Sequence, residues 1–435
     1  MRRLIPFLLL ATLAQPSAAI DLVEAHRAAL QHDADFAADV SASEVGREYL
    51  AQSRASLLPR VNITGQATRR DIEVRTSGQF SSLLNSDSSG NVYGYGVSVT
   101  QPLYRPDLKA DARNLSAQGE IAALAFRAAQ QELILRVSQA YFTVLLAQDS
   151  LAFSKAQKGA VAEQLAAAKE RFDAGRARVT DVAEAQANFD ALVATEIAAQ
   201  SELEIARARF VELTGREGED PDPLPAATMS AQSEAVQAWR DRAGAESLEI
   251  RIRDLEVAIA ESQVGRTRLA GRPSLDAVAK FDDQRQQGDL NPLAYPDRSE
   301  GMSVGVQFSM PVFAGGALQS RYRQAVAQRN QAQQQLEATR RDVDVSVRET
   351  YTQVTSGALR VAALEQGLVS AQTSLAAGEL GREVGNRTNL DVLTLQQRVF
   401  DVKRDLADAR YSYLLAKLKL AAVAGELSEA DLAAL

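Results

Sequence analysis

Apolar and polar residues alternate along four short stretches of the chain, which come in two pairs. They cover residues 61–68, 93–100, 275–281 and 302–310. In each stretch one set of alternate positions is apolar, and the other set is small or polar. A period of two predicts β-strands with one apolar face. Pro102 and Pro311 are expected to end the second strand of each pair, and the polar segments 76–91 and 282–300 are expected to form loops.

Very long helical patterns follow the strand pairs. The stretch 107–220 contains no proline. It predicts a helix over 107–172, about 100 Å long at ~1.5 Å per residue, and a return helix over 181–213 with Gly215 as its C-cap. A second proline-free stretch, 312–435, has the same plan. Two further helices are predicted at 21–57 and 233–270.

A heptad seam runs along the long helix of the second half. Nine positions advance by alternating steps of four and three, and seven of them are apolar: Val347, Tyr351, Val354, Ala358, Val361, Glu365, Leu368, Gln372 and Leu375. Such a seam predicts helices that pack side by side and nearly parallel. The many alanines allow close approach. An ordinary helical bundle has the same periodicity, so that alternative stays open.

The sequence repeats itself at an offset of 210 residues. The matching pairs are Gly175 and Gly385, Asp181 and Asp391, Val182 and Val392, Gly215 and Gly425, and, in the long helices, Val137 and Val347, Tyr141 and Tyr351, Val144 and Val354, Leu151 and Val361, and Leu165 and Leu375. We predict one protomer, 20–435, with structural repeats at 20–215 and 231–425. An acidic, proline-rich linker at 216–230 joins them. The stretches 171–182 and 381–392 are predicted to be the tips of two helical hairpins.

The N-terminus has the features of a secretory signal peptide. Arg2 and Arg3 precede the apolar run 4–14, and small residues follow at 17–19. We predict that residues 1–19 are a signal peptide, cleaved after the last of them. A buried N-terminal helix is the alternative. Without the two arginines the chain has 46 basic and 56 acidic residues, a net charge near −10, which argues against a general nucleic-acid binder.

Composition restricts how this chain could meet a membrane. The 435 residues include no Cys, so neither disulfides nor a lipid anchor on Cys is available. Beyond the N-terminus no stretch of about 18 apolar residues predicts a transmembrane helix, and entry into a membrane would use β-strands. Four strands cannot close a barrel, and open edges cannot lie in lipid, so several copies would share one barrel. Tyr93 and Tyr95 would suit an interfacial aromatic belt. A soluble β-sandwich is the alternative.

The sequence contains no recognisable catalytic constellation. His26 and His32, the only histidines, are six residues apart, which does not place them on one helical face. The Gly381-x-x-x-Gly385 spacing lies in a polar context and supports neither a phosphate loop nor a membrane helix contact. We therefore predict a conduit or scaffold with no cofactor and no metal, and not an enzyme.

Six motifs make the chain resemble the TolC family of outer-membrane efflux channels. They are L-L-P-R-V-N-I at 57–63, V-T-Q-P-L-Y at 99–104, R-F-D-A-G-R-A-R-V-T-D-V at 171–182, F-S-M-P-V-F-A-G-G at 308–316, V-G-N-R-T-N-L-D-V-L at 384–393 and A-D-A-R-Y-S-Y-L-L-A-K-L-K-L at 407–420. The resemblance extends over about residues 21 to 435, and the elements come in the same order.

The resemblance implies a homotrimer in the outer membrane of a Gram-negative bacterium. Each chain would be mostly α-helical and would contribute four strands to one twelve-stranded transmembrane β-barrel. The duplicated helical hairpins would form an α-barrel that extends through the periplasm. The tips would meet a periplasmic adaptor, also called a membrane fusion protein, which links the channel to an inner-membrane transporter of the RND or ABC class. The chain would then be a passive exit duct for efflux or type I secretion.

The resemblance also implies an entrance ringed by acidic residues. Asp391 matches the acid of that ring. Where the nearest family members have a second acid three positions on, this chain has Thr394, and the first repeat has Glu184 in the equivalent place. A ring of carboxylates attracts cations, so we expect a cation preference.

The resemblance further implies a closing network and a docking surface at the tips. Arg387 matches the family arginine of the network, and Thr180 and Asp181 match its partners. The family tyrosine is replaced by Arg382, which is expected to pair with an acid such as Asp181. The adaptor would dock at Arg171, Gly175, Val179 and Gly385. For each charged residue, helix capping or solvation is the simpler interpretation.

A soluble periplasmic coiled-coil adaptor is the second hypothesis for the function. Adaptors also contain helical hairpins, but they usually combine one hairpin with compact β-domains, whereas this sequence predicts two hairpins and two amphipathic strand pairs. The sequence does not identify the cargo. Drugs, peptides, metals and secreted proteins all remain open as substrates.

Overall fold

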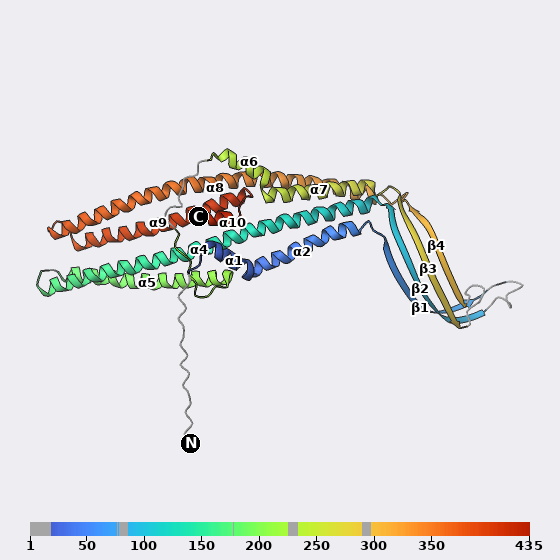
Figure 1. The fold of residues 1–435 in the computed structure, drawn as a ribbon, viewed down its shortest axis with the longest axis horizontal. Helices are drawn as coiled ribbons and strands as arrows, with labels where there is room; N and C mark the ends of the chain where they lie inside the picture. The colour runs from blue at the N-terminus through green and yellow to red at the C-terminus, as the bar shows by residue number, and fades with distance from the viewer. Residues whose placement is uncertain (1–18, 76, 78–85, 177, 225–233, 289–296) are drawn as a thin grey trace, which may run out of the picture. The chain divides into compact units, whose positions relative to one another are not determined.

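The computed structural model describes residues 19–75, 77, 86–176, 178–224, 234–288 and 297–435. The chain divides into two units, whose elements are labelled in Figure 1. The first unit comprises 1–42, 124–251 and 338–435, and the second comprises 43–123 and 252–337. The predicted signal peptide, apart from Ala19, lies outside the described residues, and so does part of the predicted linker.

Two long helical hairpins form most of the first unit, which takes their residues from 124 and from 338 onward; the earlier part of each hairpin's first helix belongs to the second unit. Helix α4 (Pro106–Asp173) pairs with α5 (Val179–Thr214), and α8 (Ala317–Glu383) pairs with α9 (Asn389–Val423). The unit also contains α1 (Leu22–His32), α6 (Val236–Glu246) and α10 (Glu429–Ala433). Both hairpins lie close to their predicted positions, because proline-free, alanine-rich sequence favours uninterrupted helix.

The helix predicted over 21–57 is wrong in one respect, because it breaks at Asp33. Helix α1 ends there, and α2 (Ala34–Ala55) begins on the next residue. The Asp33 backbone is extended. Its carboxylate accepts a hydrogen bond from the Phe36 N–H at 3.2 Å and forms an ion pair with Arg136 at 2.5 Å. An aspartate that caps the following helix competes with helix continuation.

The helix predicted over 233–270 breaks in the same way, at Ser247. Helix α6 ends before this residue, and α7 (Leu248–Leu269) begins after it. The Ser247 backbone has φ −53° and ψ 124°, outside the helical region, and the residue is buried.

Part of the predicted seam forms the buried face of α8, whereas Glu365 and Gln372 of the seam are exposed. Val347 and Val354 are fully buried, Val361 is nearly so, and the matching Val137 and Val144 of α4 are also fully buried. The seam prediction is therefore confirmed at these positions. Burial of a Val side chain contributes roughly 1.5–3 kcal/mol, so the repeated valines are a main source of hairpin stability.

The tyrosines of the seam anchor connecting segments. The Tyr141 hydroxyl donates to the carbonyl oxygens of Ile20, at 3.1 Å, and Asp222, at 2.8 Å. The Tyr351 hydroxyl donates to the Glu234 carbonyl at 3.0 Å. Matching residues of the two hairpins thus hold the chain segments that enter and leave them.

The second unit contains one antiparallel sheet. Its strands are β1 (Arg60–Val74), β2 (Ser86–Tyr104), β3 (Ser274–Gly288) and β4 (Arg298–Ser309), and they lie in the order β1-β2-β3-β4. Cross-strand partners share one face of a sheet, and the register places the predicted apolar positions of all four strands together. The period-two prediction is therefore confirmed.

The strand ends differ from the prediction. Residues 86–91 and 282–288, expected in loops, extend β2 and β3, because the backbone ladder continues where the side chains no longer alternate. Pro102 does not end β2, which continues to Tyr104 through a register shift. Among the described helices, none is long and apolar enough to cross a membrane.

The helices next to the sheet approach one another closely. A Cβ added to Gly46 of α2 would lie 2.2 Å from the Cβ of Ala122 in α4. The Ser53 hydroxyl of α2 donates to the Ala112 carbonyl of α4 at 2.8 Å. Small residues thus let α2 and α4 pack at short range, as the alanine content suggested.

Candidate functional site

The two hairpin tips have the same backbone structure. Helices α4 and α8 end at Asp173 and Glu383, and α5 and α9 begin at Val179 and Asn389, each pair at the 210-residue offset. Each first helix closes with a Schellman motif. The Arg176 N–H donates to Arg171 and the Gly175 N–H to Phe172, and the second tip repeats both bonds from Asn386 to Gly381 and from Gly385 to Arg382.

Both motifs depend on glycine. Gly175 has φ +70° and Gly385 has φ +78°, a left-handed conformation that other residues adopt only at a cost of roughly 1 kcal/mol or more. Nothing lies within 4 Å of a Cβ built on either residue. The backbone turn, and not crowding, therefore requires glycine at these two positions.

The second helix of each hairpin is capped differently. In α9 the Asp391 carboxylate accepts the Thr388 N–H and hydroxyl, both at 2.9 Å, while the Asp391 N–H donates to the Thr388 hydroxyl at 3.1 Å. This is a capping box. In α5 the residue matching Thr388 is Arg178, and the Asp181 carboxylate accepts the Arg178 N–H at 3.3 Å. Helix α5 begins two residues before its predicted start at Asp181.

The hydrogen bonds from Thr388 lower the pKa of Asp391, and the nearby Arg387 guanidinium, 4.0 Å away, adds to the effect. Asp391 is therefore ionised at neutral pH. It supplies a fixed negative charge at the tip, stabilised by the positive end of the α9 dipole. The capping interpretation and a role at an entrance are compatible, because capping leaves the charge in place.

Arg387 lies against Gly381, a contact that the sequence analysis did not predict. A Cβ on Gly381 would be 2.9 Å from the Cγ of Arg387. One turn earlier, a Cβ on Gly378 would be 2.5 Å from Leu395. The first repeat has Ala168 and Ala185 where the second has Gly378 and Leu395, and both alanines are buried. The first hairpin thus fills this contact with two alanines, and the second fills it with a glycine and a leucine.

The remaining predicted residues lie around the tips without a shared contact. Thr394 and Glu184 occupy matching exposed positions, and the Thr394 hydroxyl donates to Leu390 of its own helix at 2.9 Å. Thr180 is exposed. Arg382 is half-buried, and its side chain forms no ion pair with another described residue. The expected pairing of Arg382 with Asp181 is not present within the described part of one chain.

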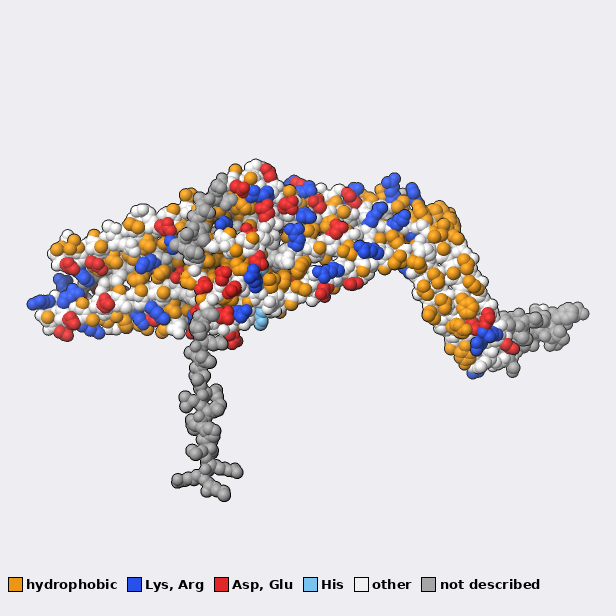
Figure 2. Space-filling model, in the orientation of Figure 1, with side chains coloured by type: hydrophobic (Ala, Val, Ile, Leu, Met, Phe, Trp, Pro, Cys, Tyr) orange, Lys and Arg blue, Asp and Glu red, His pale blue; other side chains and the backbone are white. Residues whose placement is uncertain are grey.

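The docking residues combine charge with exposed apolar surface. The Arg171 side chain donates to the Ala167 carbonyl at 3.0 Å, and Val179 is 65% exposed. Sequence reasoning missed Val384, which is 72% exposed, and Leu380, which is 62% exposed. Figure 2 shows basic side chains gathered among the apolar ones at the hairpin ends.

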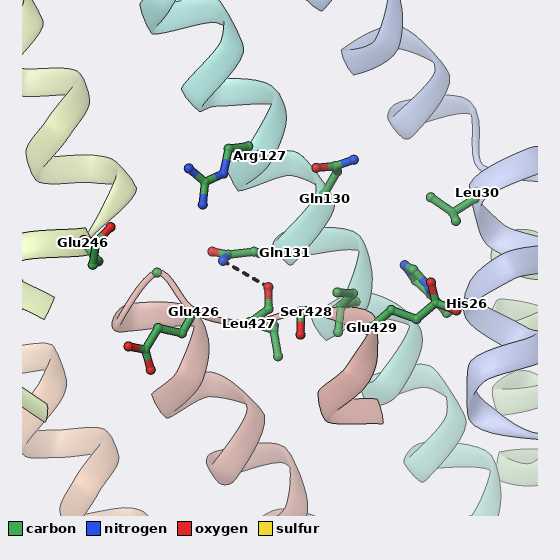
Figure 3. A pocket seen from close by; sticks show the side chains of 12 residues that line it. His26, Leu30, Arg127, Gln130, Gln131, Glu246, Glu426, Leu427, Ser428 and Glu429 are labelled. Carbon is green, nitrogen blue, oxygen red and sulfur yellow. Dashed lines mark hydrogen bonds between the residues drawn. The ribbon is translucent and has the colours of Figure 1, made fainter. Parts of the chain in front are cut away.

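A separate cavity of about 750 Å³ lies among α1, α4, α6 and the turn from α9 to α10 (Figure 3). Gln131 donates to the Leu427 carbonyl at 3.2 Å across it. Burial lowers the pKa of His26 at its edge, although the Glu429 carboxylate opposes this effect. Among the described residues, no group of three or more His, Cys, Asp or Glu side chains is placed to hold a metal ion. The cavity has no arrangement that indicates catalysis.

Comparison with known proteins identifies the family. The model of the outer membrane efflux protein family matches residues 25–216 and 239–426, which include both hairpins and all four strands. The chain belongs to this family. Its predicted location in the outer membrane and its export function are thereby confirmed, and it acts as an outer-membrane exit duct.

Curated relatives agree over nearly the whole chain. The outer membrane protein TolC of Vibrio cholerae is 31% identical over 440 residues, covering 99% of this chain and 97% of the relative. The alkaline protease secretion protein AprF of Pseudomonas aeruginosa is 32% identical, covering 99% of this chain and 90% of the relative. The resemblance to the TolC family stated from the motifs is therefore confirmed.

Solved structures show the same fold. The Campylobacter jejuni CmeC outer membrane channel matches with a TM-score of 0.79 at 16% identity, over 94% of this chain and 86% of that chain. CusC matches with a TM-score of 0.78 at 18% identity, over 95% of each chain. The predicted mostly helical fold with two hairpins and four strands is thus confirmed.

Proposed function

We propose that three copies of this chain form one passive duct that works with a periplasmic adaptor and an inner-membrane pump. The observation that carries the proposal is a sheet with an apolar region that crosses all four strands on one face, in a chain of the outer membrane efflux protein family. Among the described residues, the outer strands β1 and β4 each leave one edge unpaired. Unpaired backbone groups are very costly in lipid, and pairing of β4 with β1 of the next copy would remove both edges.

The repeat supports the same assembly. Two hairpins per chain, from repeats at 20–215 and 231–425, would give six hairpins around one tunnel. Residues 1–19 would direct export from the cytoplasm and be removed. We assign the linker 216–230 to the connection between repeats. The carbonyl oxygens of Asp222, within the linker, and of Glu234, just after it, accept hydrogen bonds from the matching tyrosines of the two hairpins.

The tips would form the periplasmic entrance. Asp391 would supply the acidic ring, and Glu184 would supply the second acidic layer in place of Thr394. Arg387 and Arg382 would close the entrance against Thr180 and Asp181 of a neighbouring hairpin. The support is geometric: Arg387 is held against Gly381 beside Asp391, while the Arg382 guanidinium has no acid within the described part of its own chain.

The adaptor would dock on the exposed apolar residues of the tips, around Val179 and Val384. Because the chain has no cysteine, Val179→Cys gives a single site for cross-linking to a periplasmic adaptor in whole cells. Ser201→Cys, also exposed on α5, is the matched control. We expect an adaptor adduct from Val179→Cys and little from Ser201→Cys. Adducts from the control alone would contradict docking at the tips.

The inner-membrane pump would determine which molecules the duct exports. The relative TolC is an outer membrane protein, and the relative AprF is named for alkaline protease secretion. We propose that this chain likewise exports molecules that a pump delivers. A deletion strain should lose either secretion of a protein substrate or resistance to small toxic compounds, and the plasmid-borne chain should restore it. Failure of the chain to restore any export phenotype of its deletion strain would contradict this proposal.

A further inference from the structure

The base of the apolar sheet face meets an unassigned cavity in the second unit. The cavity, of about 590 Å³, lies between α4 and α7 and is lined by Tyr104, Lys109, Arg113, Asn114, Gly265 and Arg266, among others. Tyr104 pairs with Leu275, an apolar-face position of β3. The cavity therefore opens where the apolar face ends and the helices begin.

Two contacts hold the cavity walls together. The Arg266 guanidinium of α7 forms an ion pair with Asp111 of α4 at 3.3 Å, and the Ser262 hydroxyl donates to the Ala110 carbonyl at 3.4 Å. Most of the remaining wall is apolar, from Ala117, Ile259 and Leu269. The site is thus a preformed, largely apolar cavity with a few polar groups.

The rim has an excess of positive charge. Lys109 and Arg113 are exposed, lie one turn apart on the same face of α4, and form no ion pair with any other described residue. Arg266 adds a third cation, whose charge is partly balanced by its ion pair with Asp111, and Glu261 is the only acidic side chain lining the cavity as described. Unpaired cations beside a hydrophobic surface suit an anionic group that carries an apolar body.

Asn114 adds a requirement for a hydrogen-bond donor. Its side-chain oxygen is buried and accepts no hydrogen bond from the described residues. A buried acceptor without a donor costs about 1–3 kcal/mol. An occupant with an N–H or O–H group near its anionic group would therefore be favoured.

We propose that this cavity binds a phospholipid from the membrane leaflet that borders the helices. The phosphate would contact Lys109, Arg113 and Arg266, a headgroup N–H or O–H would donate to Asn114, and an acyl chain would follow Tyr104 onto the apolar face. Leu103, 52% exposed, continues this apolar surface. Figure 2 shows apolar side chains covering the sheet and basic ones gathered over the adjoining helix ends. A soluble phosphate would use the cations but not this surface.

The test measures lipid binding to the purified, delipidated full chain by native mass spectrometry. Phosphatidylglycerol is the probe, and diacylglycerol and inorganic phosphate are the comparison ligands. Lys109→Gln with Arg113→Gln removes the two unpaired cations, and we expect affinity to fall about tenfold or more, since each basic residue near a lipid surface contributes on the order of 1 kcal/mol. Arg268→Gln with Arg323→Gln, which removes two exposed cations outside the cavity, should leave affinity unchanged.

A second variant tests the cavity itself. Gly265 lines the cavity, and a Cβ built on it meets nothing within 4 Å. Gly265→Phe should therefore place its ring in the cavity and abolish binding of phosphatidylglycerol. Equal losses in both double variants would overturn the proposal. Binding of diacylglycerol as tight as that of phosphatidylglycerol would overturn phosphate recognition, and displacement of the lipid by millimolar inorganic phosphate would overturn the choice of a lipid. The test does not depend on the proposed trimer or its partners.

Discussion

At the scale of single residues, the tip of the second hairpin depends on two glycines, whose lack of a side chain lets neighbouring side chains approach closely. Gly381 leaves room for the stem of Arg387, and Gly378 leaves room for Leu395. The Gly381-x-x-x-Gly385 spacing gave no sign of either contact, because a contact between α8 and α9 emerges only when the hairpin is folded. The sequence identified Arg387 through resemblance, but the contact that positions its side chain could be found only from the structure.

We predict that Gly381→Val increases channel conductance. The added methyl groups would displace the Arg387 side chain and separate it from Asp391. The conductance should rise, as expected for Arg387→Ser, but by a smaller amount. Gly367→Val, in the same helix with open space around its Cβ, should leave conductance unchanged in planar bilayers, and an equal effect of both variants would contradict a specific role for Gly381.

Thr388→Ala should loosen the first turn of α9. It removes the hydroxyl that both caps the helix and holds Asp391, which costs about 1 kcal/mol. Amide hydrogen exchange in residues 390–393 should become about fivefold faster at this cost. Thr394→Ala, which loses only a bond within its own helix, is the control, and similar exchange in both variants would show that the cap is unimportant.

His26 should make the first unit less stable in mild acid. Burial lowers its pKa below the ordinary 6.5, so the unfolded chain binds the proton more readily than the folded chain. The stabilisation is present above pH 6.5 and is lost as the pH falls toward the lowered pKa. Thermal unfolding of His26→Gln should therefore change less between pH 7.5 and pH 5 than that of the native chain. His32→Gln, at an exposed position, should behave like the native chain; identical pH dependence in all three would contradict the prediction.

At the scale of elements, periodicity predicted which helices and strands exist, but it predicted poorly the residues at which they begin and end. The four strands and both hairpins follow from periods of two and about three and a half, because one face of each is buried or apolar over much of its length. The helix breaks at Asp33 and Ser247 carry weak signals, since the apolar pattern continues across them. Strands β2 and β3 continue into polar sequence because backbone pairing with a neighbour needs no apolar side chain.

Packing of α2 on α4 gives a prediction at this scale. Gly46→Leu would place its side chain into Ala122 and should destabilise the second unit by about 1–3 kcal/mol. Gly159→Leu, in open space on α4, should be neutral or slightly stabilising because leucine favours helix. Thermal unfolding of the purified protein compares the two, and equal midpoints would mean that α2 and α4 can separate at little cost.

At the scale of the whole molecule, the proposed duct depends on assembly of several copies. The described part of one chain has a sheet with two open edges and tips whose charged residues meet few partners. Sequence alone could predict that such a sheet needs copies of itself. It could not predict the bonds at the entrance, because Arg382 and Thr394 replace the residues that the family resemblance would have supplied.

The most direct test of the exit-duct function is single-channel recording of the purified full chain in planar bilayers. We expect a stable pore of low conductance that prefers cations. Asp391→Ala should reduce the cation preference by removing the ionised carboxylate at the tip, and Arg387→Ser should raise the conductance. A well-folded preparation that forms no channel, or a pore whose ion selectivity is unaffected by Asp391→Ala, would contradict the account.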